Sequence, residues 1–123
     1  VSKRYKPSVT LIGGLINRPT LSVSGMQSLE FIKSLNFDIA FMVASAFSLQ
    51  NGFTCGNYSE CELKHNITGK AKQTILLDSS KFDKSMPFTF APLESVDILI
   101  TDTRPADEVL ARAKENGVTV LWE

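Results

Sequence analysis

Two apolar runs that stop abruptly at polar residues constrain the fold of this chain more than any other feature. The first, Leu76-Leu77, leads into Asp-Ser-Ser-Lys at 78–81, and the second, residues 96–100, leads into Thr101-Asp102. Such runs are typical of buried parallel strands, which bind ligands where they reach the carboxyl edge of their sheet. The first run delivers a carboxylate, two hydroxyls and a lysine ammonium, a set of groups that suits a small polyhydroxylated anion such as a sugar phosphate.

Along the rest of the chain, apolar runs alternate with helical patterns, which indicates strand–helix units and a largely parallel sheet. Strands are predicted at residues 9–12, 20–23, 38–43, 74–77, 96–101 and 118–122, with a short extended piece at 88–90 inside a loop. Helices are predicted at 25–35, from the region of 57–60 to 71, and between Pro105 and Gly117. The segment 44–48 is expected to be irregular, and residues 50–53 carry a turn signal.

Polar residues at the predicted helix starts provide candidate caps. Ser24 and Gln27 have the spacing of a capping box for the first helix. Asn57 and Ser59 offer overlapping caps for the second helix, and Asp102 is expected to cap the helix near Pro105.

Composition excludes several classes of protein. At 123 residues and 43% hydrophobic content the chain is expected to form one domain, residues 1–123. Thirteen basic and thirteen acidic side chains give a formal net charge of zero, which argues against a nucleic-acid reader acting by itself.

No apolar run approaches the ~18–20 residues of a membrane span, so a cytoplasmic protein is expected. Cys55 and Cys61 are too few and too irregularly placed for a disulfide framework or a zinc site, and neither metal nor cofactor is predicted.

Several short motifs occur in an order that points to a known family. They are Leu-Ile-Gly-Gly at 11–14, Val-Ser-Gly at 23–25, Asp-Ile-Ala-Phe at 38–41, Asn-Gly-Phe-Thr at 51–54, Glu60 with Lys64, Leu-Asp-Ser-Ser-Lys-Phe at 77–82, and Asp-Ile-Leu-Ile-Thr-Asp at 97–102. With these motifs spread over nearly all of its length, the chain resembles the effector-sensing domain of DeoR-type bacterial transcriptional repressors. The Asp-Ser-Ser-Lys-Phe piece is the most specific of them.

The resemblance implies a Rossmann-like α/β domain, with a largely parallel sheet flanked by helices, similar to ribose-phosphate isomerases and coenzyme A transferases. It implies a non-catalytic sensor that binds a phosphorylated sugar, works as a homo-oligomer, and modulates operator DNA binding by an attached helix-turn-helix. The family's amino-terminal helix-turn-helix and its first strand with a Gly-Thr-Thr phosphate loop are absent here, so an incomplete copy is expected. Many members also have glycine where this chain has Ala46.

Three candidate ligand-binding residues carry charge. Lys81, directly beyond a buried strand, could pair with phosphate or could be a solvated loop lysine. Asp78 could orient Lys81 or accept from sugar hydroxyls, and could equally close the turn through its own backbone. Glu60 could reach a sugar hydroxyl from the first turn of its helix, although capping and the helix dipole explain an acid there as well.

Three further candidates are small or neutral. Ser45 and Gly52 belong to the segment that leaves the third predicted strand, where a hydroxyl beside flexible backbone suits a polar ligand and a plain turn is the alternative. Gly14 is the sixth ligand-binding candidate, although a strand-ending turn that needs positive φ accounts for it too. His65 has no sequence partner for a metal or catalytic constellation and is expected on the surface.

Two other functions stay open at this stage. A sugar-phosphate isomerase-like or coenzyme A transferase-like enzyme could use the same fold, with Glu60 or Asp78 as general base. An oligomerisation module whose ligand site has decayed is also compatible with the sequence.

Overall fold

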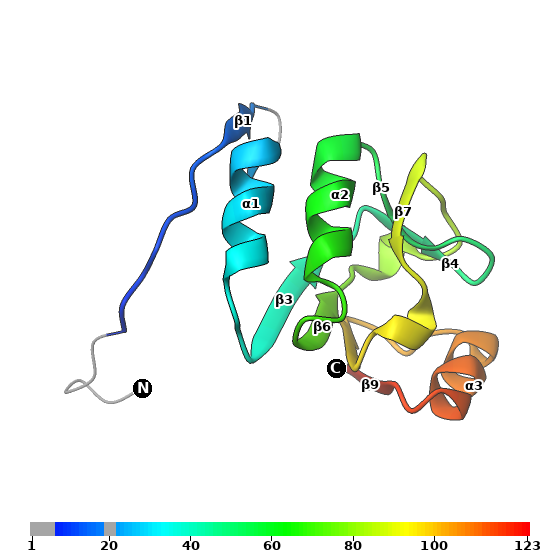
Figure 1. The fold of residues 1–123 in the computed structure, drawn as a ribbon. Helices are drawn as coiled ribbons and strands as arrows, with labels where there is room; N and C mark the ends of the chain where they lie inside the picture. The colour runs from blue at the N-terminus through cyan, green and yellow to red at the C-terminus, as the bar shows by residue number, and fades with distance from the viewer. Residues whose placement is uncertain (1–6, 19–21) are drawn as a thin grey trace.

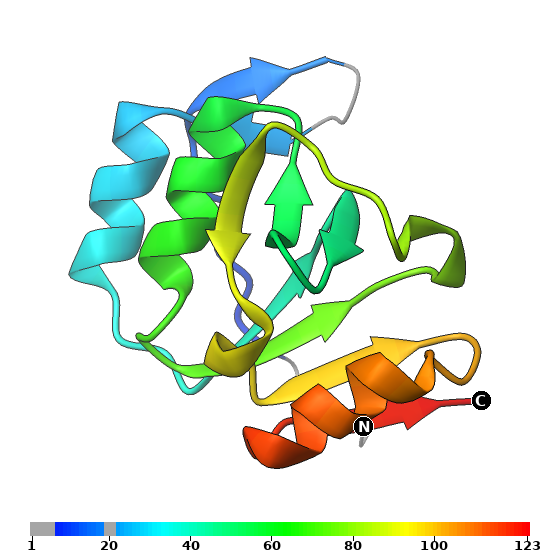
Figure 2. The ribbon, with the colours of Figure 1, turned by 90° about the vertical axis from the view of Figure 1, so that its right-hand side faces the viewer.

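A four-stranded parallel sheet forms the centre of the molecule in a computed structural model, which describes residues 7–18 and 22–123. Its strands are β3 (Ile39–Val43), β6 (Lys72–Leu76), β8 (Ile98–Thr101) and β9 (Thr119–Trp122), in the spatial order β3-β6-β8-β9 (Figures 1 and 2). All three neighbouring pairs are parallel. The predicted largely parallel α/β sheet is therefore confirmed.

The helices form one layer on one side of this sheet. They are α1 (Met26–Ser34), α2 (Tyr58–Ile67) and α3 (Asp107–Glu115), with two short 3-10 turns, η1 (Ser79–Lys81) and η2 (Leu93–Ser95). α1 packs beside α2 (Figures 1 and 2). Met42, Ile75 and Leu99 of the sheet join the core beneath this layer, together with Val109 and Ala113 of α3. Within the described ranges, no helix has the length and apolar character needed to cross a membrane.

A second, antiparallel sheet packs into the same core. It has the order β4-β5-β7 and consists of β4 (Ala46–Ser48), β5 (Gly52–Cys55) and β7 (Phe88–Ala91). The prediction of an irregular segment at 44–48 holds for 44–45 and is wrong for 46–48, which form β4 because Phe47 is buried and packs against Phe53, with ring centroids 4.7 Å apart. The turn predicted at 50–53 is present between β4 and β5, but it lies at 49–51, and residues 52–53 already belong to β5.

The beginning of the chain differs from the prediction. Residues 9–12 form no strand, and Val9 and Leu11 are 89% and 91% exposed. A strand persists where its backbone groups pair with a neighbour, and no strand of the described chain lies beside this run. A short antiparallel pair follows instead, β1 (Leu15–Asn17) with β2 (Ser22–Ser24). Of the predicted strand at 20–23, residues 20 and 21 lie outside the described part.

Of the three predicted N-terminal helix caps, only the cap of α2 is confirmed. Asn57 caps α2, since its side-chain oxygen accepts from the backbone N–H of Glu60 at 3.1 Å. The capping box of Ser24 is wrong, because the cap of α1 is Gly25 and no side chain bonds to that helix end. Asp102 does not cap α3, whose cap residue is Ala106.

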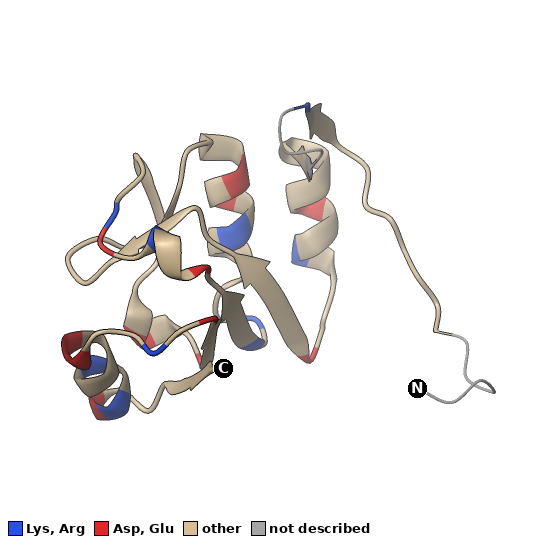
Figure 3. Ribbon diagram, turned by 180° about the vertical axis from the view of Figure 1, so that it is seen from behind, with Lys and Arg blue, Asp and Glu red and all other residues tan. Residues whose placement is uncertain are grey.

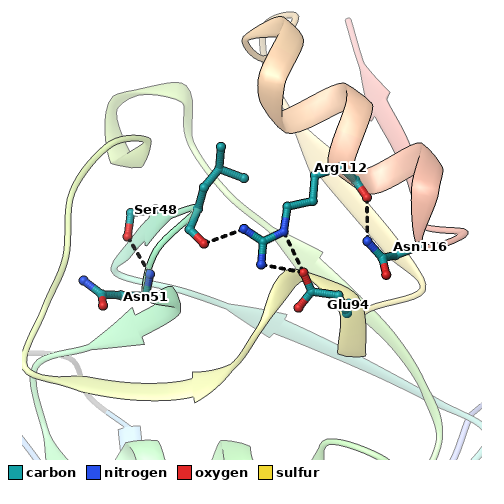
Figure 4. Close-up of polar contacts among 6 residues, drawn as sticks. Ser48, Asn51, Glu94, Arg112 and Asn116 are labelled. Atoms are coloured by element: carbon teal, nitrogen blue, oxygen red, sulfur yellow. Dashed lines mark hydrogen bonds and ion pairs between the residues drawn. The ribbon is translucent and has the colours of Figure 1, made fainter.

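Arg112 ties α3 to the rest of the fold. Its Nε and Nη2 donate to Oε1 of Glu94 in η2, both at 2.7 Å, and its Nη1 donates to the carbonyl of Leu49 at 2.8 Å (Figure 4). Leu49 lies in the turn between β4 and β5, where Ser48 Oγ also accepts from the N–H of Asn51 (Figure 4). One guanidinium therefore connects the last helix, a 3-10 turn and the β4–β5 hairpin.

Candidate functional site

A cleft of about 570 Å³ opens beside the carboxyl end of β3, between that strand and α2. We call it the β3–α2 cleft. Most of its lining is apolar, and its polar side chains come from Ser45 after β3 and from Glu60 and Lys64 on α2. The lining residues are Val23, Phe41, Met42, Val43, Ala44, Ser45, Glu60, Leu63, Lys64 and Ile67.

The two charged residues of this cleft are placed by helix geometry. Glu60 and Lys64 are four residues apart, so they share one face of α2, with the acid nearer the helix N-terminus, as the helix dipole favours. Lys64 Nζ donates to the carbonyl of Val43, the last residue of β3, and lies 5.3 Å from the centre of the Phe90 ring. These contacts hold an ammonium group at the carboxyl end of the strand, where it can pair with an anion.

A second cleft, of about 340 Å³, lies along the carboxyl ends of β6 and β8 and shares Val43 with the first. We call it the β6–β8 cleft. Its polar residues include Asp78, Thr101 and Asp102. Two carboxylates make this cleft acidic, so its oxygens suit sugar hydroxyls, which donate hydrogen bonds, better than they suit a phosphate.

Asp102 fixes the turn that follows β6. One oxygen of its carboxylate accepts from the backbone N–H of Ser79 at 2.6 Å, and the other accepts from the Ser79 hydroxyl at 2.9 Å. These bonds, the backbone one foremost, hold the pKa of the Asp102 carboxyl below its ordinary value of 3.8. Asp78 accepts locally from the hydroxyl of Ser80. The polar segment 78–81 is thus anchored to the end of β8 rather than left as a free loop.

The structure brings some of the predicted site residues together and separates others. Ser45 and Glu60 meet in the β3–α2 cleft, and Asp78 lies in the adjoining β6–β8 cleft. Lys81 is exposed in η1 and is not among the residues that line either of these clefts. Its backbone N–H donates to the carbonyl of Asp78 at 2.9 Å.

The two candidate glycines lie where another backbone or side chain approaches closely. Gly52 is buried in β5 with φ +73°, and a Cβ built there would lie 2.6 Å from the carbonyl oxygen of Ala91. At Gly14 a Cβ would lie 2.1 Å from Oγ of Ser28, whose hydroxyl donates to the carbonyl of Gly13. Neither glycine lines the two clefts, and close packing accounts for both.

Lys64 is the residue that sequence reasoning left out of the candidate site. Its four-residue spacing from Glu60 on a predicted helix already places the two side chains on one face. The same reasoning could therefore have paired them as a cation and an acid. His65, expected on the surface, is exposed, and its Nδ1 lies 3.2 Å from the carbonyl oxygen of Phe90.

Comparisons with known proteins agree on one family. Residues 1–103 match the family model described as the DeoR C terminal sensor domain. The chain is 32% identical to the HTH-type transcriptional regulator GlpR of Haloferax volcanii over 114 residues, which are 92% of this chain and 45% of that protein. The same figures apply to the HTH-type transcriptional regulator IolR of Bacillus subtilis. Identity to the deoxyribose operon repressor of Escherichia coli is 32% over 98 residues, 76% of this chain and 39% of the repressor. The chain thus spans less than half the length of these relatives.

Proposed function

Because this chain belongs to the family of DeoR C-terminal sensor domains, we propose that it binds a phosphorylated sugar or a related catabolite and thereby modulates operator binding by an attached helix-turn-helix. The two relatives named HTH-type regulators and the named operon repressor support a regulatory role rather than a catalytic one. The ligand acts as a signal when its affinity differs between the DNA-binding arrangement and the released one.

The observation that carries this proposal is the placement of one cation, Lys64, at the junction of two clefts whose other charged side chains are acids, Glu60 in the first cleft and Asp78 and Asp102 in the second. The ammonium of Lys64 stands at the end of β3 in the first cleft, whereas Asp78 and Asp102 supply acceptors in the second. A sugar phosphate has the matching polarity, with an anion at one end and hydroxyl donors along its length. We therefore place the phosphate near Lys64 and the hydroxyls toward Asp78, with Ser45 and Glu60 as further polar contacts.

A thermal-shift series on the complete gene product tests this assignment. The probes are ribose 5-phosphate and glucose 6-phosphate, the two free sugars, and inorganic phosphate. A ligand that binds the folded state raises the melting temperature by mass action, so one phosphosugar should stabilise the protein while its parent sugar does not. A turnover assay with the same phosphosugars covers the enzymatic alternative, for which the expected result is no product.

Two lysine variants locate the anion. Lys64→Gln should weaken phosphosugar binding about 10- to 100-fold, because a charge-assisted hydrogen bond contributes roughly 1.5–3 kcal/mol. Lys114→Gln, at an exposed position in the last turn of α3, is the matched control and should leave affinity unchanged. Equal affinity in both variants would remove Lys64 from the site, and Lys81→Gln would then decide whether the anion is held at η1.

A further inference from the structure

The outer edge of β9 is an open strand edge. β9 ends the strand order β3-β6-β8-β9, and no strand of the described chain pairs with it on the side away from β8 (Figure 2). It contains no proline, charged residue or irregularity of the kind that protects natural edge strands. Its sequence, Thr-Val-Leu-Trp, consists of β-branched, aliphatic and aromatic residues that suit a strand. This edge can therefore accept a further strand.

Two large apolar side chains are exposed on this edge strand. Leu121 and Trp122 are 49% and 44% exposed, and they lie on opposite faces of the sheet because successive side chains of a strand alternate. Val120 packs against the core beneath the helices, and Trp122 follows it on the same face. Exposed tryptophan is enriched in protein–protein interfaces, so the edge has the composition of an interaction surface.

The bonding of β9 to β8 determines which backbone groups point outward. The N–H of Thr119 donates to the carbonyl of Asp97, the residue before β8, at 2.9 Å. Alternate residues of a strand direct their N–H and C=O groups to opposite sides, so Thr119 and Leu121 face β8. The backbone groups of Val120 and Trp122 therefore face the open edge.

These outward groups select one antiparallel register for a second copy of β9. A two-fold axis at Leu121 pairs Val120 of each copy with Trp122 of the other, and each such pair exchanges both backbone hydrogen bonds. It also places a β-branched side chain opposite an aromatic one, which is a favourable cross-strand pair. A register centred on Val120 would need the N–H of Val118, which already donates to the carbonyl of Ala113 at 2.8 Å.

The side of α3 next to this edge carries opposite charges at its two ends. Arg112 points from α3 toward Glu94 and the β4–β5 hairpin, away from the open edge (Figure 4). Asp107, Leu110 and Lys114 have the spacing i, i+3, i+7, so they share the opposite side of the helix. Asp107 and Lys114 are exposed and Leu110 is half-buried.

This charge pattern is complementary to itself. A two-fold axis normal to the sheet sets α3 antiparallel to its copy, so that Asp107 of each faces Lys114 of the other and the two Leu110 side chains meet near the axis. Acidic and basic residues are both present along α3 (Figure 3). Neighbouring strands are about 4.8 Å apart, so two helices that each lie over β8 and β9 would be roughly 10 Å apart, which is near the spacing of packed helices.

We propose that β9 and α3 form an interface with a second copy of this chain, in which the two β9 strands pair antiparallel around Leu121 and join the two parallel sheets into one. The occupant is a copy because the surface complements itself in both backbone register and charge. β9 lies at the opposite edge of the sheet from β3, beside which the β3–α2 cleft opens. The interface therefore leaves this cleft open, and the proposal does not depend on the proposed function.

Cysteine cross-linking in the complete gene product tests the register. In the proposed pairing the two Leu121 positions form a non-hydrogen-bonded pair with Cα atoms about 4.5 Å apart, within the range of a disulfide. Leu121→Cys is oxidised with copper phenanthroline, and the disulfide-linked dimer is measured on non-reducing gels against the parent protein. Cys55 and Cys61 contribute little, because both are buried and burial raises the pKa of Cys61 to about 11.

Thr119→Cys is the matched control. Thr119 is exposed on the same face of β9, but the two Thr119 positions would lie roughly 14 Å apart in the proposed register. Leu121→Cys should therefore cross-link at least about 10-fold faster than Thr119→Cys. Equal rates at the two positions would indicate random collisions and would overturn the proposal. Absence of a cross-link at Leu121 would overturn it too, since the edge would then be solvated or covered by something other than a second copy.

A charge exchange on α3 provides an independent readout in the Leu121→Cys protein. Asp107→Lys places like charges opposite each other and should slow cross-linking about 10-fold in dilute, low-salt solution. Adding Lys114→Asp restores opposite charges and should restore the rate. Glu108→Lys makes the same change in charge roughly 100° around the helix and should leave the rate unchanged. Equal slowing by Asp107→Lys and Glu108→Lys, or no recovery in the double exchange, would contradict the proposed pairing of the helices.

Discussion

Replacement of Gly52 by alanine tests whether this predicted ligand residue has a structural role instead. At φ +73° an alanine adopts the left-handed conformation, which costs roughly 1–2 kcal/mol and is partly offset by about 0.4–1 kcal/mol from the stiffer unfolded chain. The new Cβ would also lie 2.6 Å from the Ala91 oxygen and 2.9 Å from Cα of Pro92. Both neighbours are backbone atoms, so relief requires β5 and β7 to separate, at about 1–3 kcal/mol. We expect Gly52→Ala to lower the free energy of unfolding by about 2–4 kcal/mol.

Gly117→Ala is the matched control. Gly117 has φ +72°, and a Cβ there meets no atom within 4 Å, so the control carries the backbone strain without the collision. Gly117→Ala should lower the free energy of unfolding by about 0.5–1.5 kcal/mol. Urea unfolding of both variants can be followed by the fluorescence of Trp122, the single tryptophan of the chain.

The difference between the two variants in free energy of unfolding measures the effect of the close contact between β5 and β7, because the backbone strain is common to both. A Gly52→Ala variant no less stable than Gly117→Ala would refute the packing argument. Loss of phosphosugar binding in a fully stable Gly52→Ala variant would restore this glycine to the ligand site.

Two further predictions concern the polar contacts that shape the sheet edge and the core. The hydrogen bonds from Ser79 lower the pKa of Asp102, so the stabilising contribution of this contact is present above the ordinary value of 3.8 and is lost as pH falls through the lower folded-state pKa. The NMR chemical shift of the Ser79 amide should therefore change with a midpoint below 3.8, and this transition should be absent in Asp102→Asn. A midpoint above 3.8 would contradict the contact. Arg112→Ala should lower the free energy of unfolding, measured in urea, by about 1.5–2 kcal/mol, because it removes a partly exposed ion pair to Glu94 and a charged hydrogen bond to the Leu49 carbonyl. A decrease of less than about 0.5 kcal/mol would show that the guanidinium does not connect the hairpin to α3.

The parallel sheet and its helices could be predicted because their signals are local. β3 and β8 are short apolar runs, β6 ends in one, and α1 has its apolar residues at helical spacing, so each is recognisable within its own window. The boundaries differ by a few residues; α2, for example, ends at Ile67 instead of near residue 71.

The antiparallel sheet could not be predicted in the same way. β4 and β5 have three and four residues, and both are buried throughout, so neither shows the alternation of a half-exposed strand. The pairing of β5 with β7 joins residues more than 30 positions apart, such as Phe53 with Ala91, and depends on the packed aromatic core rather than on local pattern. The prediction of a strand at 9–12 was wrong for the opposite reason, because this run has the local pattern of a strand but no neighbouring strand in the described chain.

The sequence located the edge of the sheet where the two clefts lie and named part of their lining, while ligand binding at these residues stays a prediction. Polar strand ends located the carboxyl edge, and Ser45, Glu60 and Asp78 do lie along it. The sequence offers no measure of where a loop lysine lies, so it names Lys81 as a candidate and leaves out Lys64, whose position follows from the helix and its bond to β3. That Asp102 anchors Ser79 depends on β6 and β8 being neighbours, which the pattern of single strands does not show.

The most direct test of the central claim is an NMR titration of the ¹⁵N-labelled chain with the phosphosugar that gives the largest thermal shift. The account predicts saturable amide shifts at Ser45, at residues 60–64 and at Ser79, together with smaller shifts from the parent sugar. Saturable shifts confined to other parts of the molecule, or none at millimolar ligand, would contradict a sugar-phosphate site at the carboxyl edge of this sheet.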